Sequence, residues 1–158
     1  MRESDYHLLQ GFPLFRQMKD DDFDTLMRHG TMIECTPYRV LAREGELPEA
    51  LFILVEGLFE LSSANKGHLA TVSFIRPPTA FIIAAVVLNQ PYLVSARSLV
   101  ASRVFSLPVG IFRQFMASHP DFAMSACREL AMRYRDMVKE LKNVKSRTAG
   151  QRLANWIL

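Results

Sequence analysis

Carboxylates are the side chains best placed to do chemistry, because they gather in one short part of the sequence. Between residues 44 and 60, the candidates for a general acid or base are Glu44, Glu46, Glu49, Glu56 and Glu60. Two of them flank Gly45 and a third precedes Gly57, so turn formation explains much of this clustering. The chain has no nucleophile elbow, Walker loop or HExxH motif, and we find no Ser/His/Asp constellation. The sequence therefore argues against an enzyme, and we assign no catalytic residue.

Residues that commonly hold metals are scattered along the chain. Asp20, Asp21 and Asp22 are consecutive, and consecutive helix residues point in different directions, so they indicate a helix N-terminus. Cys35 and Cys127 form no CxxC motif and have no metal-ligand spacing. We assign no metal site, and we expect both thiols to be packed in a reduced, cytoplasmic protein.

Short strands separated by turns are predicted over most of residues 31–108. The strands are expected at 32–36, 40–43, 51–55, 58–62, 70–75, 93–98 and 104–107, with a hairpin loop at 63–68. Many short strands at regular spacing are typical of a sandwich or barrel. Helices are predicted on either side, at 6–10, 19–29 and 109–118.

A long helix is predicted from 120 to 145, because no Pro or Gly follows Pro120 until Gly150. It carries an apolar seam at alternating steps of three and four, as in a coiled coil: Cys127, Leu130, Tyr134, Met137, Leu141 and Val144. A second apolar row lies to one side: Phe122, Ala126, Ala131 and Val138. Two apolar faces predict two partners, the helix's own domain and a second copy of the chain. One amphipathic helix lying on a single core is the alternative.

Basic residues gather towards the C-terminal end. From His119 onward there are 8 Lys and Arg against 4 Asp and Glu, and the rest of the chain is nearly neutral. A nucleic-acid-binding face and a solvated helix exterior both explain this surplus. The first ten residues show no secretory signal, and the most apolar window, 80–88, is too short to span a membrane. With Ser146 or Thr148 as a helix cap, residues 146–158 predict the start of a further domain.

Two stretches carry a resemblance to a known family. The run AREGELPEALFILVEGLFELS, from residue 42, is similar to the start of a cyclic-nucleotide-binding domain, with a Gly-Glu turn and two apolar strands around Glu-Gly. The run HPDFAMSACRELAMRYRDMVKELKNVKSRTAGQRLANWIL, from His119, resembles the segment that joins the sensor and DNA-binding parts of bacterial CRP/FNR transcription regulators. The resemblance implies a mainly β fold with helices, an antiparallel jelly-roll (double-stranded β-helix) barrel followed by a long dimerisation helix.

The same resemblance implies a division into three parts. Residues 1–118 would form an effector-sensing domain with short N-terminal helices, and 119–145 would form the dimerisation helix. Residues 146–158 would begin a winged helix-turn-helix domain that is missing from this chain. Such a regulator is a homodimer through the seam of the long helix, binds DNA through that C-terminal domain, and involves no membrane.

Regulators of this family that bind cyclic nucleotides hold the phosphate in a cassette made of a Gly-Glu pair and an Arg-Ser-Ala block. Glycine lets backbone N–H groups approach the phosphate, and arginine pairs with it. In this chain the Gly, the Glu and the Arg of that cassette are all missing. Arg97 lies three residues from the Arg position and is expected on the other face of its strand. The positions assigned to an effector pocket are Phe81, Ile83, Ala84, Val94, Ser95, Ala96, Met137 and Val138.

These departures argue against cyclic AMP or cyclic GMP as the effector. Met137 and Val138 stand where the resemblance places two hydroxyl residues that meet the purine, so the pocket is expected to take an apolar ligand or none. Since two cysteines cannot ligate an iron–sulfur cluster, that cofactor is rejected. Two alternatives stay open, a stand-alone cyclic-nucleotide-binding module and a haem-dependent sensor of nitric oxide or carbon monoxide. For haem the candidate ligands are several methionines together with His7, His29, His68 and His119.

Overall fold

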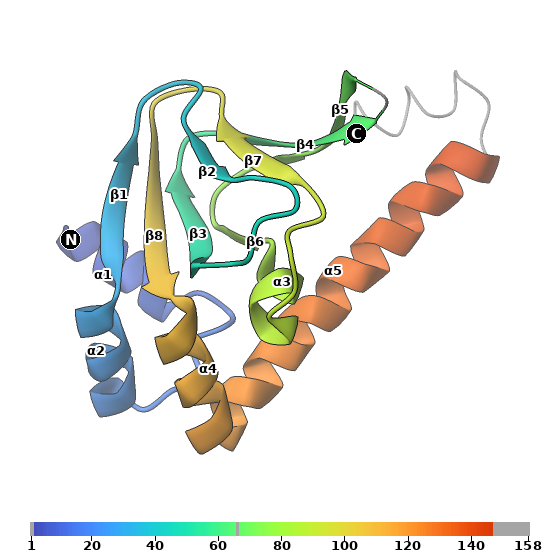
Figure 1. Ribbon diagram of the computed structural model, residues 1–158. Coiled ribbons are helices and arrows are strands. Elements are labelled where there is room, and N and C mark those ends of the chain that lie inside the picture. Colours follow the sequence, from blue (N-terminus) through green and yellow to red (C-terminus); the bar gives the residue numbers. More distant parts are fainter. Residues whose placement is uncertain (1, 66, 147–158) are drawn as a thin grey trace.

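The computed structural model describes residues 2–65 and 67–146. Figure 1 shows a β unit with helices at one end and a long helix that runs past it. The chain begins with α1 (Glu3–Gln10) and α2 (Asp20–His29). Three aspartates occupy the first turn of α2 and Gly30 follows its last residue, which confirms the predicted helix. Helix α1 begins at Glu3 and is therefore longer than the predicted turn at 6–10.

The strands of the described residues form two four-stranded antiparallel sheets, in the orders β1-β8-β3-β6 and β2-β7-β4-β5. This arrangement confirms the predicted antiparallel jelly-roll class, although hydrogen bonding within the described chain leaves two sheets rather than one closed barrel. The strands are β1 (Thr31–Cys35), β2 (Val40–Ala42), β3 (Ala50–Glu56), β4 (Phe59–Asn65), β5 (His68–Ile75), β6 (Thr79–Phe81), β7 (Ser95–Ser98) and β8 (Ser102–Pro108).

Two parts of the strand prediction are wrong. The predicted hairpin is present, but β4 and β5 pair as far as Asn65 and His68, so its loop is shorter than the predicted 63–68. The run after residue 78 also folds differently from the prediction. It forms the short strand β6 and the helix α3 (Ile83–Leu88), neither of which was predicted, and β7 begins only at Ser95.

The C-terminal helices follow the prediction closely. Helix α4 covers Val109–Ser118, and α5 covers Pro120–Ser146. The two helices meet at His119, and the ring of Phe122 in α5 packs edge-on against Phe112 in α4, with centroids 5.5 Å apart. No described helix, α5 included, is both long and apolar enough to cross a membrane.

The buried side chains form two cores. One lies between the sheets and includes Phe59, Phe81 and Ala96. The other lies between the β1-β8-β3-β6 sheet and the helices, and it includes Phe112 and Phe122. Because a jelly-roll buries one face of each sheet against the other, the outer face of the first sheet depends on the helices for cover.

A buried ion pair fixes the N-terminal helix to the first sheet. Asp5 of α1 accepts two hydrogen bonds from the guanidinium of Arg103 in β8, one of them 2.8 Å from Nη1 to Oδ1. Arg103 also contacts the exposed carboxylates of Glu34, at 3.2 Å, and Glu56, at 3.8 Å. The hydrogen bonds from Arg103 hold the pKa of Asp5 below its ordinary value, against the opposite effect of burial.

Candidate effector-binding site

The first half of the cassette is turned into the interior. Phe81, at the end of β6, stacks on Phe52 with ring centroids 5.8 Å apart and lies 5.3 Å from the ring of Phe59. Ile82 then adopts a left-handed backbone with φ of 52°, which reverses the chain into α3. Ile83 is buried in the core beneath the helices, whereas Ala84 is exposed. The side chains at Phe81 and Ile83 thus belong to the two cores of the fold.

The second half of the cassette lies on and just before β7. Ala96 is fully buried between the sheets, in the same core as Phe81. Ser95 is half-buried, and its hydroxyl oxygen accepts a hydrogen bond of 3.0 Å from the backbone N–H of Glu44. Val94 is half-buried and precedes the strand. The structure therefore brings Phe81 and Ala96 into one core, and the one polar side chain that remains from the family pattern already has a partner.

Arg97 lies on the opposite face of β7 from Ala96, as the strand period predicts. Its Nη2 donates a hydrogen bond of 2.7 Å to Glu60, and its guanidinium carbon lies 5.8 Å from the ring centre of Tyr38. Thr71 donates a second hydrogen bond, of 2.5 Å, to Glu60. The hydrogen bond from Thr71 and then the hydrogen bond from Arg97 hold the pKa of Glu60 below its ordinary value, against the opposite effect of burial. This arginine is therefore engaged outside the cassette.

Helix α5 turns one face towards its own domain. Phe122 and Ala126 are buried in the core beneath the helices, which confirms that this row rests on the β domain. Glu129 is also buried on this face, and it accepts a hydrogen bond of 2.9 Å from Arg133. The assignment of Ala131 to the same row is wrong, because this residue is exposed. Val138, the last member of the row, is half-buried.

The apolar seam lies on a different side of α5. Tyr134, Met137 and Leu141 have exposed fractions of 64%, 58% and 52%, and Cys127 and Val144 are exposed as well. Leu130 is the exception, since it packs against the core beneath the helices. Met137, which was assigned both to the seam and to the effector pocket, belongs to neither core.

A groove between β5 and α5, which the sequence did not reveal, has a volume of about 340 Å³. Polar and charged residues of α5 line it together with the end of β5 and the turn that follows. Its α5 side continues the face of Glu129 at steps of three and four, and that periodicity was the signal available in the sequence. The lining residues are Ser73, Phe74, Ile75, Arg76, Thr79, Arg133, Asp136, Lys139, Glu140 and Asn143.

The described histidines and cysteines do not form a metal centre. His7, His29 and His68 are exposed, and His119 is half-buried against the ring of Phe115 with centroids 4.6 Å apart. Within the described residues, no three His, Cys, Asp or Glu side chains gather where a metal ion could bind. Cys35 is buried, and burial raises the pKa of its thiol. The expectation that both thiols are packed is wrong for Cys127, which is exposed.

Comparisons with known proteins agree on one fold. A family model described as "Cyclic nucleotide-binding domain" matches residues 33–119. A regulatory protein from Silicibacter pomeroyi DSS-3 has a TM-score of 0.73 at 22% identity, over 99% of this chain and 72% of that one. Catabolite activator protein from Thermus thermophilus has a TM-score of 0.70 at 19% identity, over 84% of this chain and 63% of that one. No curated protein matches the chain.

A third solved structure corresponds to a sensor domain. The sensor domain of the transcriptional regulator DNR from Pseudomonas aeruginosa has a TM-score of 0.71 at 18% identity, over 81% of this chain and 91% of that one. At such identities these likenesses establish the arrangement of the strands and helices, and they leave the ligand undetermined.

Proposed function

The chain belongs to the cyclic nucleotide-binding domain family, since the family model matches more than half of it, and on this basis we propose that it is the effector-sensing and dimerisation part of a CRP/FNR-type transcription regulator. In this proposal residues 1–118 sense the effector and 119–145 join two copies. DNA is bound by a domain that begins at 146–158, a segment that lies mostly outside the described residues. The regulator acts in the cytoplasm and catalyses no reaction.

One observation carries the proposal, namely that the seam of α5 is exposed while the neighbouring face is buried. Tyr134, Met137 and Leu141 each expose more than half of their surface, at steps of three and four that a second identical helix would match. Exposed apolar side chains that form a continuous stripe mark an interaction surface. A homodimer covers this stripe and leaves the Phe122 face on its own domain.

The contacts around the cassette support an effector other than a cyclic nucleotide. A phosphate would meet Ile83 and Val94 where the family places Gly and Arg, and burying an unpaired phosphate charge against apolar side chains is costly. Arg97 is engaged by Glu60 on the opposite face of the sheet. The cassette therefore suits an apolar ligand, or packs on itself and takes none.

The mechanism we infer is a population shift of α5. A ligand at the Ile83 and Val94 positions that reached Met137 and Val138 would change how α5 lies against its domain. Since the two copies share the seam, a change in the position of α5 would change the orientation of both DNA-binding domains together. A ligand achieves this only through a difference in its affinity for the two arrangements.

The substitution Leu141→Glu tests the dimer. It places a carboxylate in the exposed part of the seam, where two copies would bring like charges together, and we expect the dimer to dissociate into monomers. Arg135→Glu is the matched control, because Arg135 is exposed and belongs to neither apolar row. Multi-angle light scattering measures the mass of each variant. A dimeric Leu141→Glu variant would refute the seam as the interface.

A further inference from the structure

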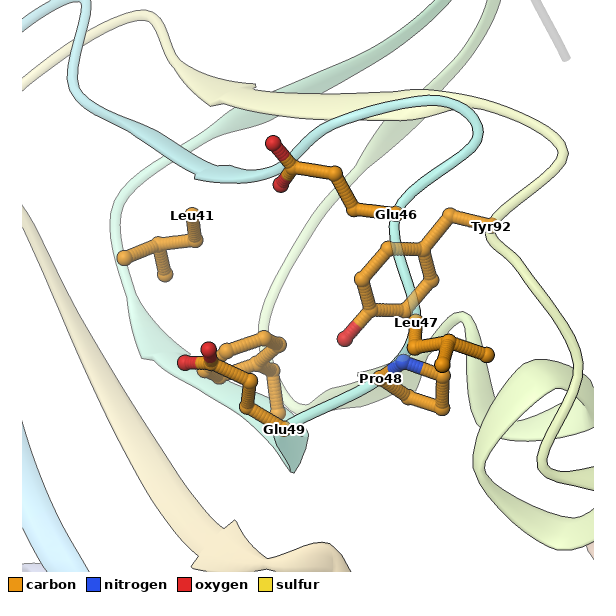
Figure 2. A pocket seen from close by; sticks show the side chains of 7 residues that line it. Leu41, Glu46, Leu47, Pro48, Glu49 and Tyr92 are labelled. Carbon is orange, nitrogen blue, oxygen red and sulfur yellow. The ribbon is translucent and has the colours of Figure 1, made fainter.

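A cavity of about 460 Å³ opens beside the connection between β2 and β3 (Figure 2). This volume lies within the range of sites that hold small organic molecules. None of the positions assigned to the effector pocket lines this cavity. We call it the Tyr92 cavity, and its lining is Leu41, Glu46, Leu47, Pro48, Glu49, Phe52 and Tyr92.

Backbone pairing holds Tyr92 against the β2–β3 connection. The N–H of Gly45 donates to the carbonyl of Tyr92 at 2.8 Å, and the N–H of Tyr92 donates to the carbonyl of Glu46 at 2.9 Å. The side chain of Tyr92 is only 4% exposed, yet its hydroxyl points into the cavity (Figure 2). The backbone N–H of Glu49 lies beside this hydroxyl and interacts with its oxygen. Tyr92 therefore brings an aromatic ring and one polar atom to the wall of the cavity.

Two carboxylates place negative charge at the cavity mouth. Glu46 and Glu49 are both exposed there, and neither forms an ion pair with any residue that the structure describes. Burial raises the pKa of the Tyr92 phenol. The nearby N–H of Glu49 opposes this shift, and the charges of Glu49 and Glu46 add to it. Both carboxylates therefore act on the space that the phenol faces, and a ligand there meets a negative potential.

The remaining walls are apolar. Leu41 and Phe52 belong to the lining. Leu47 and Pro48 lie beside the Tyr92 ring (Figure 2). Apolar and aromatic walls bind an apolar body, and an aromatic ring also attracts a cation placed near its face. An anion would be repelled by the two carboxylates, and a neutral molecule would gain nothing from them.

We propose that the Tyr92 cavity binds a small organic cation, a protonated amine that carries an apolar body. Its ammonium group lies between the carboxylates of Glu46 and Glu49 and donates to them. The face of the Tyr92 ring attracts the same cation, and the apolar body rests on Leu41 and Phe52. No assigned position of the effector pocket lines the cavity. A negative result here would therefore leave the function proposed above unaffected, and the reverse also holds.

Titration with 2-phenylethylamine, followed by NMR chemical shifts of the protein, tests the proposal. We expect saturable shifts of residues 41–52 and of Tyr92, weakened by added salt because the ammonium is paired with exposed carboxylates. Phenylacetate and 2-phenylethanol share the ring and carry a negative charge or none. Both compounds should bind at least about tenfold more weakly than 2-phenylethylamine, because neither can donate charged hydrogen bonds to the carboxylates.

The double variant Glu46→Gln/Glu49→Gln should lower the affinity for 2-phenylethylamine about tenfold and leave the melting temperature unchanged, because both side chains are exposed. Tyr92→Phe keeps the ring and tests the hydroxyl, with a smaller loss expected. Glu3→Gln removes the same charge from exposed α1 and should change nothing.

Four results would overturn the proposal, three with small molecules and one with a peptide. The first is the absence of saturable shifts, and the second is equal binding of phenylacetate. The third is undiminished binding to the double variant. A Gly-Lys-Gly peptide that binds more tightly than 2-phenylethylamine would show instead that the cavity takes a side chain of a partner protein, and it would equally exclude a small-molecule site.

Discussion

The ring of Phe52 stacks on the ring of Phe81, with centroids 5.8 Å apart and planes 20° from parallel. The two residues are register partners of β3 and β6, so the backbone fixes the stack. Phe52 also lines the Tyr92 cavity, and Phe81 is the first assigned position of the effector pocket. A single aromatic pair therefore separates the cavity from the cassette, and any movement of one ring must be accommodated by the other because interiors are close-packed.

Truncation of Phe81 should be costly for the fold. The ring is buried against both Phe52 and Phe59, so Phe81→Ala removes its contacts and leaves a cavity. We expect the free energy of unfolding to fall by about 3 to 5 kcal/mol, measured by urea denaturation. Phe74→Ala is the matched control, since Phe74 is 52% exposed and should cost about 0.5 kcal/mol or less. Equal losses in the two variants would contradict the packing described for Phe81.

Cyclic AMP should not stabilise the protein. A ligand present at about 100 times its dissociation constant raises the free energy of unfolding by about 2.7 kcal/mol, which a melting curve detects easily. With Ile83 and Val94 at the phosphate positions, we expect no change in the melting temperature at about 5 mM cyclic AMP, far above the level at which a specific site would saturate. A clear upward shift would contradict the cassette assignment.

Stability should fall in acid partly through the Asp5–Arg103 pair. The pKa of Asp5 is lower in the folded protein than in the unfolded chain, so its contribution is complete above the ordinary value of 3.8. That contribution is lost as the pH falls through the folded-state pKa. Asp5→Asn should remove about 2 kcal/mol at neutral pH and flatten the acid slope, as denaturation at several pH values would measure.

Two comparisons make the acid experiment specific to Asp5. Glu34→Gln removes another carboxylate from Arg103, but the Glu34 side chain is 72% exposed, so we expect a loss below about 1 kcal/mol. Glu60 also has a lowered pKa, so some acid slope persists in the Asp5→Asn variant. An Asp5→Asn variant with an unchanged slope would rule out the pair as a source of acid sensitivity.

The sequence predicted elements whose signals are local. The apolar residues of α5 repeat at helical spacing and most strands lie between turn residues, so the bounds of α5 and of several strands were predicted closely. Arg97 was placed on the correct face by the strand period alone. The same reasoning assigned Leu130 to the seam, although in the structure it packs on its own domain, because one helix position can border two faces.

The parts that the sequence did not reveal depend on contacts between distant residues. The run 79–88 is a continuous apolar stretch rich in Ile and Val, so it has no period from which to choose between strand and helix. Left-handed residues at Ile82 and Asn89 bound α3, and neither is a glycine. The Tyr92 cavity forms because the backbone of Tyr92 pairs with Gly45 and Glu46. These residues are far apart in the sequence, so no local sequence pattern predicts the contact.

A ligand bound in the Tyr92 cavity should change the NMR chemical shifts of Phe81. Since Phe52 lies between them, 2-phenylethylamine bound in the cavity should shift the aromatic NMR signals of Phe81 with the same midpoint as those of Tyr92. Phe23 belongs to the other core and should not respond. The substitution Phe52→Leu keeps an apolar wall but removes the stack, so binding should persist while the response of Phe81 shrinks. If Phe81 responds equally in that variant, the stacked pair does not connect the two sites.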